Sequence, residues 1–402
     1  MPWNWQRSDW PNFTWDKHRF QKAEEQFLVG KGVYAGIVRH LGLPAREQLT
    51  IEAMSTEALT TSEIEGEFLD RESVQSSIRK QLGLAVDNRR SGPAEQGVAE
   101  MMVNLYRTFA KPLSGATMFV WHGMLLKGRG DLEDIGRYRT GAEPMQIVSG
   151  ALYSPKVHFE APPSARVPRE MKRFVEWFNR TAPNGSDPLP ALTRAGMAHL
   201  YFESIHPFED GNGRIGRSIS EKALAQSAGQ PTLTALAATI LVRRKAYYEA
   251  LAAASKSNEL TPWLAWFAGI ALEGQRRTEA RVEFLIDKTR LLDRLRGVFN
   301  ERQEKALLRV LREGPEGFKG GLSAGNYLAI TGASPATATR DLAEMVEAGA
   351  FVRTGERRHA RYAAAIPPQV VLPVEIDAEG NLITGTLSQL CWHGGGGLGT
   401  AT

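Results

Sequence analysis

Apolar residues recur at intervals of three or four along most of the chain before residue 290, the spacing that places them on one face of a helix. This pattern predicts helices over residues 19–43, 44–58, 73–84, 93–109, 115–126, 169–179, 190–205, 215–226, 232–257 and 261–288. Alanine and leucine are frequent in the later ranges, and both residues favour helix. We therefore expect a mainly α-helical protein.

One stretch near the middle of the chain breaks the helical pattern. Gly141, Pro144, Gly150 and Pro155 punctuate a short extended run at residues 145–148. Glycine and proline at this spacing are typical of turns between short strands. We expect a small β-hairpin here, with helices before and after it.

The pattern changes again near residue 298, where the order becomes helix, helix, turn, helix and β-ribbon. The tail ends in "HGGGGLGTAT", a composition typical of a partly disordered segment. We expect four parts: a helical N-terminal domain at 2–84, a central core at 110–285, a C-terminal domain at 298–365 and the tail at 366–402.

Four tryptophans, at positions 3, 5, 10 and 15, stand in the opening stretch "WNWQRSDWPNFTWD". Large aromatic side chains gain most from burial, so we favour packing onto the following helices over an exposed surface for a partner.

Composition and charge narrow the class of protein only a little. The formal net charge of +4 and the pI near 9.1 are mildly basic and do not by themselves indicate nucleic-acid binding. The single cysteine, Cys391, cannot form an intrachain disulfide, which is typical of a reducing compartment. The N-terminus has no apolar signal segment and no run is long enough to cross a bilayer. We expect a cytoplasmic protein without membrane contact.

The densest chemistry lies in "HPFEDGNGRIGR", residues 206–217. Glycines allow a sharp turn before a helix, and the backbone N–H groups at such a helix start favour an anion. Arg214 and Arg217 are three apart on that helix and can clamp two phosphates. Asp210 can hold Mg²⁺, and His206 has an imidazole suited to accept a hydroxyl proton. The stretch therefore predicts a phosphate site.

The stretch has two other interpretations. A structural histidine in a glycine-rich helix cap is the more common case for His206 alone, but the twelve residues together favour the phosphate site. A zinc pair of His206 and Asp210 is set aside, because Pro207 and the glycine turn prevent a shared helical face.

These twelve residues resemble the signature of Fic (Fido-fold) enzymes, HPFx[DE]GNGRxxR, at every specified position. The stretches "GRYRTGAEPMQI" and "YSPK" resemble the family's flap, and "AHLYFESIHPF" resembles the helix that leads into the loop. The resemblance implies a helical Fido core with a β-hairpin flap. It implies a protein adenylyltransferase that transfers AMP from ATP to a Ser, Thr or Tyr hydroxyl of a target protein, with the chain itself as one candidate target.

The resemblance also implies roles for single residues. His206 would be the general base, and Asp210 would bind the Mg²⁺ that bridges the α- and β-phosphates. Arg214 would hold the β-phosphate and Arg217 the γ-phosphate. The residues expected to form the anion hole are Gly211, Asn212 and Gly213. ATP is thus the expected substrate and Mg²⁺ the expected cofactor, while another nucleotide donor or a phosphocholine donor stays open.

Two further regions gain expected roles from the resemblance. Residues 140–153 could align a target segment as an added strand. The stretch "AYYEALAAAS" resembles the adenosine-side helix, which would place Tyr248 near the base. Many relatives carry Asn where this chain has Ser255, and core packing of Tyr247 and Tyr248 is an equal alternative.

The stretch "TTSEIEGEFLD" matches the family's inhibitory pattern, [ST]xxxE[GN], at Thr61, Glu65 and Gly66. The resemblance implies a helix before the core whose Glu65 pairs with Arg217 and keeps it from the γ-phosphate. A reverse reaction that removes AMP is also implied for some relatives.

The alternative interpretation of this stretch is a solvated acidic surface, since it also contains Glu63 and Glu67. Residues 2–84 as a whole resemble an uncharacterised domain often fused to bacterial Fic cores, which supports the architecture without adding chemistry.

The C-terminal domain resembles a winged helix-turn-helix. Ser334 caps a helix, and the candidate nucleic-acid contacts are Thr337, Thr339 and Arg340 on that helix and Arg357 and Arg358 in the following turn. A protein-contact or structural module is an equal alternative. If the domain binds DNA, the chain could instead be a transcriptional regulator that uses the Fic core as a nucleotide sensor. Whether the protein is a homodimer is left open.

Overall fold

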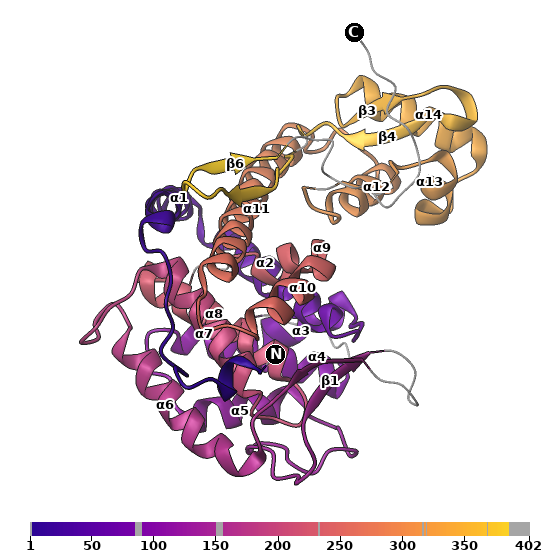
Figure 1. Cartoon of the computed structure of the whole chain (residues 1–402). Coiled ribbons are helices and arrows are strands. Elements are labelled where there is room, and N and C mark those ends of the chain that lie inside the picture. The colour runs from indigo at the N-terminus through magenta and orange to yellow at the C-terminus, as the bar shows by residue number, and fades with distance from the viewer. Residues whose placement is uncertain are drawn as a thin grey trace. The chain divides into compact units, whose positions relative to one another are not determined.

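The computed structural model describes residues 2–84, 91–149, 156–231, 234–315, 317–318, 320–367 and 369–385 (Figure 1). The chain divides into two compact units, which are described separately here. The first comprises Met1–Gln275 with Leu372–Thr402, and the second comprises Arg276–Val371.

The first unit is helical, with two small antiparallel hairpins. Its α-helices are α1 (Gln21–His40), α2 (Leu43–Ile64), α3 (Arg71–Leu82), α4 (Pro93–Thr108), α5 (Gly115–Leu125), α6 (Val167–Arg180), α7 (Ala191–Ile205), α8 (Asn212–Ala228), α9 (Leu236–Val242) and α10 (Arg244–Ala254). Helix α11 (Thr261–Arg294) begins here and continues into the second unit. The strands are β1 (Gln146–Ser149), β2 (Lys156–Glu160), β5 (Val374–Ile376) and β6 (Leu382–Thr384), and the 3-10 turns are Asn4–Gln6, His18–Phe20 and Ser164–Arg166.

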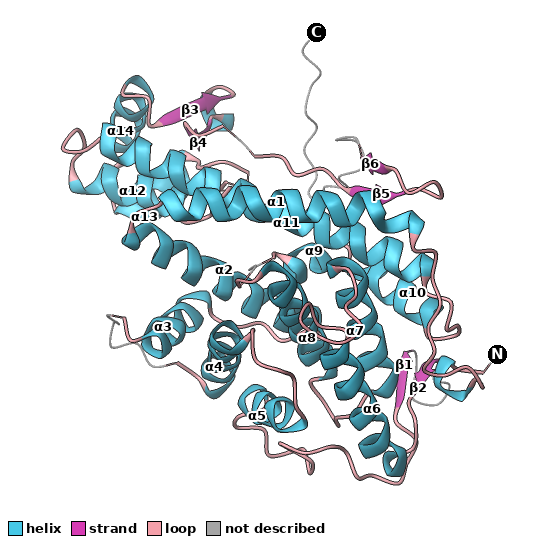
Figure 2. Cartoon of the chain, turned by 90° about the vertical axis from the view of Figure 1, so that its left-hand side faces the viewer, coloured by secondary structure: helices cyan, strands magenta, loops and turns pink. Residues whose placement is uncertain are grey.

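Helices α7 and α8 form the centre of this unit and lie side by side in Figures 1 and 2. Nearly every residue of α7 is buried, and the opening turns of α8 are buried as well. Gly196 of α7 lets α11 approach closely, because a side chain there would meet Leu264 and Phe267. Trp263 completes this packing by donating its indole N–H to the Gly196 carbonyl at 2.8 Å. The two central helices therefore fix the loop that joins them.

The tryptophans of the N-terminal stretch pack against this core, so the preference for burial is confirmed. Trp5 and Trp10 are buried, and Trp3 and Trp15 are partly buried. Trp10 also donates its indole N–H to the carboxylate of the buried Glu170, at 3.0 Å. The stretch thus fastens the start of the chain to helix α6.

The mainly α-helical fold with small hairpins is confirmed, but several predicted boundaries were wrong. Helix α2 continues to Ile64, six residues beyond its predicted end, and α8 begins at Asn212. The range 232–257 is interrupted at Arg243, whose φ of −117° breaks the helix into α9 and α10. Arg243 pairs there with the buried Glu273 of α11 at 2.5 Å. A contact distant in sequence therefore accompanies the break.

The predicted hairpin is present as β1 and β2, which pair from Gln146 with Glu160 to Ser149 with Lys156. An irregularity in register falls between Ile147 and Val148. Part of the predicted flap, residues 150–153, lies outside the described residues.

The second unit has a hydrophobic core of its own. It contains α12 (Glu301–Leu311), α13 (Ala324–Thr331), α14 (Pro335–Glu347), the strands β3 (Phe351–Thr354) and β4 (Arg361–Ala364), and a 3-10 turn at Arg357–His359. Ser334 caps α14 by accepting a hydrogen bond from the Thr337 N–H. The buried Asp341 joins the helices, because it accepts hydrogen bonds from Tyr327 and Arg302.

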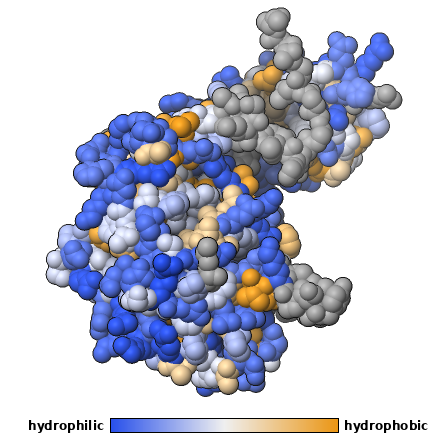
Figure 3. Space-filling model, in the orientation of Figure 1, coloured by the Kyte–Doolittle hydropathy of each residue, from blue (hydrophilic) through white to orange (hydrophobic). Residues whose placement is uncertain are grey.

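The face of the molecule drawn in Figure 3 is mostly hydrophilic, with apolar residues scattered in small groups. Within the described ranges, every helix is too short or too polar to cross a bilayer.

Candidate active site

The candidate loop begins where α7 ends. His206 follows Ile205 with φ 49°, a left-handed conformation that turns the chain out of the helix. The buried Arg139 holds this turn, because its Nε donates to the His206 carbonyl at 2.8 Å and its backbone N–H donates to the Pro207 carbonyl at 3.0 Å. His206 is therefore presented by a braced backbone at the end of a buried helix.

The loop closes on itself through Asn212. Its side-chain amide donates to the Phe208 carbonyl at 2.9 Å, and its side-chain oxygen accepts from the Phe208 N–H at 2.9 Å. Gly211 has φ 81° and turns the chain into α8. The Asn212 side chain thus closes the loop. The backbone N–H groups in the first turn of α8 lie at the positive end of the helix dipole, which favours an anion.

His122 of α5 packs against the loop, a contact that was not predicted from the sequence. Its ring stacks on the buried Phe208, with centroids 4.2 Å apart. Its Nδ1 accepts from the Gly136 N–H at 2.8 Å, so its Nε2 donates to the Asp210 carbonyl at 3.0 Å. Burial lowers the pKa of His122 in spite of the bond to Asp210, which favours this neutral form.

Arg217 is buried on α8, and its Nε and Nη2 bind the end of α2, while its Nη1 has no hydrogen-bond partner among the described residues. Its Nε donates to the Thr61 hydroxyl at 2.7 Å, and its Nη2 donates to the Thr61 carbonyl at 2.9 Å and to Glu65 Oε1 at 2.7 Å. Burial alone would lower the pKa of Arg217, but Glu65, Tyr247 and Glu203 together more than offset this and raise it. The guanidinium therefore stays charged in its buried position.

The Glu65 carboxylate lies on the first turn of α8. A side chain at Gly213 would overlap Glu65 Oε1, so glycine is needed there for this approach. Glu65 was expected on the helix, but α2 ends at Ile64 and Glu65 is the residue that follows. Gly66 then turns the chain with φ 85°, a conformation that favours glycine. A carboxylate thus lies beside Gly213, against the first turn of α8.

Glu67 is a second carboxylate at the site, and the inhibitory pattern assigned it no role. Arg214 is buried, and its Nη1 donates to Glu67 Oε2 at 2.6 Å. The signal that could have indicated this pair is the placement of Glu65 and Glu67 on either side of Gly66. Both arginines of the motif are therefore occupied by acidic side chains from the same short segment.

Asp210 is half-exposed at the mouth of the site. Its Oδ2 accepts from Arg129 Nη1 at 3.0 Å, and its Oδ1 accepts from the Gly211 N–H at 2.6 Å. No three carboxylate, imidazole or thiol side chains converge into a metal cluster within the described residues. A single exposed carboxylate fits Mg²⁺, which usually takes one or two protein carboxylates together with phosphate oxygens and water.

Two segments of the chain match known protein families. Residues 112–224 match the Fic/DOC family, and residues 3–84 match a domain of unknown function, DUF4172. The chain contains a Fic/DOC domain.

Curated relatives of the Fic/DOC domain are similar over short segments. A probable protein adenylyltransferase of Aquifex aeolicus is 31% identical over 81 residues, which cover 20% of this chain and 22% of that protein. Protein adenylyltransferase fic-1 of Caenorhabditis elegans is 28% identical over 102 residues, which cover 25% and 18%. The aligned segments thus span about a fifth of the length of these relatives.

Among solved structures, a Fic family protein from Desulfovibrio desulfuricans G20 aligns with a TM-score of 0.48 at 22% identity, covering 85% of this chain and 95% of that one. Fic-1 of C. elegans aligns with a TM-score of 0.44 at 22% identity, covering 64% and 72%.

The two tyrosines that follow the Fic/DOC segment have different surroundings. Tyr247 is buried, and its hydroxyl lies 2.8 Å from His199 Nε2. Tyr248 is 41% exposed, and its hydroxyl donates to the Ile64 carbonyl at 3.4 Å. Of the open alternatives, core packing therefore holds for Tyr247, while Tyr248 lies at the surface beside the end of α2.

The candidate nucleic-acid contacts lie in the second unit. Thr339 and Arg340 are exposed on α14, and Thr337 is partly exposed there. The hydroxyl of Thr339 is bonded to the Pro335 carbonyl at 3.0 Å, so its polar group is used locally. Arg357 is exposed in the turn, and the Arg358 side chain lies outside the description.

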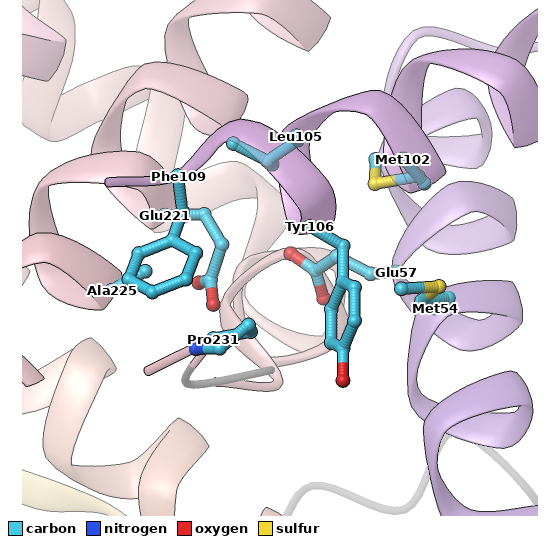
Figure 4. A pocket seen from close by; sticks show the side chains of 9 residues that line it. All are labelled: Met54, Glu57, Met102, Leu105, Tyr106, Phe109, Glu221, Ala225 and Pro231. Atoms are coloured by element: carbon cyan, nitrogen blue, oxygen red, sulfur yellow. The ribbon is translucent and has the colours of Figure 1, made fainter. Parts of the chain in front are cut away.

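A pocket also lies between α2, α4 and α8, lined by Met54, Glu57, Met102, Leu105, Tyr106, Phe109, Glu221, Ala225 and Pro231 (Figure 4). Glu57 accepts from the Ala237 N–H at 2.7 Å, and Glu221 accepts from the Thr234 N–H at 3.1 Å. These two carboxylates fix the segment that leads into α9. The pocket contains none of the predicted site residues.

Proposed function

We propose that this protein is an adenylyltransferase that transfers AMP from ATP to a Ser, Thr or Tyr hydroxyl of a protein, itself included. One observation carries the proposal: a carboxylate, Glu65, lies beside Gly213 on the first turn of α8 and pairs there with the buried Arg217. An anion already fits this position, and a phosphate chain is the ligand for which a helix start with two arginines is suited.

The proposed reaction follows from the placement of the loop. The hydroxyl oxygen attacks the α-phosphorus while its proton passes to His206. The new O–P bond forms as the bond to the leaving pyrophosphate breaks. Arg214 and Arg217 offset the charge on the β- and γ-phosphates, and the N–H groups of residues 211–213 cradle the anion. Mg²⁺, when held by Asp210, would neutralise phosphate charge.

The same contacts support an autoinhibited resting state. Glu65 occupies Nη2 of Arg217 and Glu67 occupies Nη1 of Arg214, so a phosphate has to compete with two carboxylates for these guanidiniums. Removal of AMP from a modified protein is part of the proposal as a reverse activity of this site.

Incubation of the Glu65→Gly protein with ATP and Mg²⁺, followed by mass spectrometry of the protein and of added lysate, tests the proposal. The expected product is an AMP adduct on a hydroxyl side chain, and adding His206→Ala to the same protein should remove it. A parallel incubation with the other nucleoside triphosphates and CDP-choline identifies the donor. Transfer of a different group, or no transfer, would exclude the proposed reaction.

A DNA-binding regulator is the second candidate, favoured by the distribution of charge. Residues 276–371 hold 17 Lys and Arg against 12 Asp and Glu, a net charge of +5 in a chain whose total is +4. A mobility-shift assay with the chain's own promoter DNA, with and without ATP, tests it. Binding that Arg340→Ala and Arg357→Ala weaken would support this function, and absence of binding at low salt would exclude it.

A further inference from the structure

Glu203 is a partly buried carboxylate on the last turn of α7, three residues before His206. Its Oε2 lies 3.6 Å from His206 Nδ1, and the two side chains are 12% and 14% exposed. This Nδ1 is itself buried and has no hydrogen-bond partner among the described residues. The carboxylate is therefore the polar group placed to act on this side of the ring.

The surroundings of Glu203 favour its charged form. Gly216 of α8 leaves room for Glu203 Oε1, because a side chain there would come within 2.5 Å of it. Burial alone would raise the pKa of Glu203, but His206, His199 and Arg217 more than offset this and lower it. Two further groups border this cluster: Glu65, which pairs with Arg217, and Tyr247, which contacts His199.

The backbone of His206 is fixed without Glu203. Its carbonyl accepts from Arg139, and its N–H donates to the Phe202 carbonyl at 3.0 Å. What these bonds leave undetermined is the orientation of the ring and which of its nitrogens carries the proton. In a neutral imidazole one nitrogen donates and the other accepts, and a carboxylate beside Nδ1 selects the form with the proton on Nδ1.

We propose that Glu203 is a positioning residue that holds Nδ1–H of His206 toward its carboxylate and leaves the Nε2 lone pair for the target hydroxyl. The inference rests on the proposed function, since it assigns how the base of that reaction is prepared. During transfer the hydroxyl proton moves to Nε2, and Glu203 stays ionised and stabilises the imidazolium that forms. After the product leaves, the proton returns from Nε2 to solvent.

The tautomer of His206 tests the proposal without ATP or a target. In the full chain labelled with ¹⁵N-histidine, long-range ¹⁵N–¹H correlation spectra report the protonated nitrogen, and the His206 signals are those lost in His206→Ala. We expect the neutral ring to carry its proton on Nδ1, and Glu203→Leu to shift the population toward Nε2. A native chain with the proton on Nε2 would overturn the proposal, whether or not the Glu203→Leu protein folds.

Kinetics supply the second test, in the Glu65→Gly background. Glu203→Gln should lower kcat about 10- to 100-fold while the KM for ATP stays unchanged, because the residue acts through His206 and not on the nucleotide. Glu170→Gln is the matched control. Glu170 is a buried glutamate, but it pairs with Arg166 at 3.0 Å, so its replacement should leave kcat unchanged. Full kcat in a folded Glu203→Gln protein would overturn the proposal. If the Glu65→Gly parent transfers no AMP, the proposed reaction fails, and the tautomer alone decides the role of Glu203.

Discussion

Replacing Glu65 by glycine should release the proposed inhibition, and the structure sets the size of the effect. The change removes one charge-assisted hydrogen bond, at 2.7 Å, to a guanidinium that is 2% exposed. Such a bond contributes about 1.5–3 kcal/mol. At about 1.4 kcal/mol for each factor of ten, the population whose Arg217 is not paired with a carboxylate should rise about 10- to 150-fold. The two bonds from Arg217 to Thr61 remain, so the guanidinium should stay in place.

The assay is the initial rate of AMP incorporation into the protein itself, with ATP labelled at the α-phosphate and saturating Mg²⁺. The matched control is Glu63→Gly, which removes a neighbouring carboxylate and loosens the same end of α2. In the described structure the Glu63 side chain contacts neither arginine of the motif. It should therefore leave the rate close to that of the unaltered protein.

Two results would refute this reasoning. Equal rates for the unaltered and Glu65→Gly proteins would show that the contact with Arg217 does not limit activity. An equal gain from Glu63→Gly would show that loosening the helix end, and not loss of the Glu65 charge, causes the release.

Three further changes test the remaining contacts of the site. Glu67→Gln should raise the rate about 2- to 5-fold, less than the change at Glu65, because Glu67 is more exposed and water screens its ion pair. Added salt should reduce this gain, and a gain that is independent of salt would show that the ion pair is not its cause. His206→Ala in the Glu65→Gly background should lower the rate at least about 100-fold, the usual contribution of a general base, and a residual rate near that of the parent would remove His206 from the mechanism. Arg129→Gln should lower the Mg²⁺ concentration for half-maximal activity about 2- to 5-fold, because it removes the exposed ion pair between Arg129 and Asp210. A magnesium titration that gives a higher half-maximal concentration would show that Arg129 assists the metal instead.

The helical fold could be predicted from the sequence because the periodicity of buried positions is a local signal. The boundaries that were wrong depend on contacts distant in sequence. Helix 232–257 was predicted as continuous because its residues favour helix throughout, but its break coincides with the pair between Arg243 and Glu273 of α11. No window of sequence around Arg243 contains that partner.

The candidate site likewise combines residues that are neighbours in sequence with residues that only folding brings together. Residues 206–217 are consecutive, so their proximity and the turn at Gly211 could be predicted from the motif. His122 and Arg139 reach the loop only through folding, and the residues around each of them in sequence give no indication of the contact. Sequence reasoning could therefore name the groups proposed to touch the substrate, but not those that hold the loop in place.

The geometry of the two acidic pairs constrains how the proposed inhibition could be released. Glu65 and Glu67 reach their arginines from one turn, and the N–H groups of both residues donate to the Ser62 carbonyl at 3.0 Å. A side-chain rotation at one glutamate would break one ion pair and leave the other in place. Movement of the end of α2 as a unit away from α8 would break both pairs together, along with the two bonds from Arg217 to Thr61. A releasing signal should therefore act on α2 or on its contacts, and a nucleotide has to compete against both carboxylates at once.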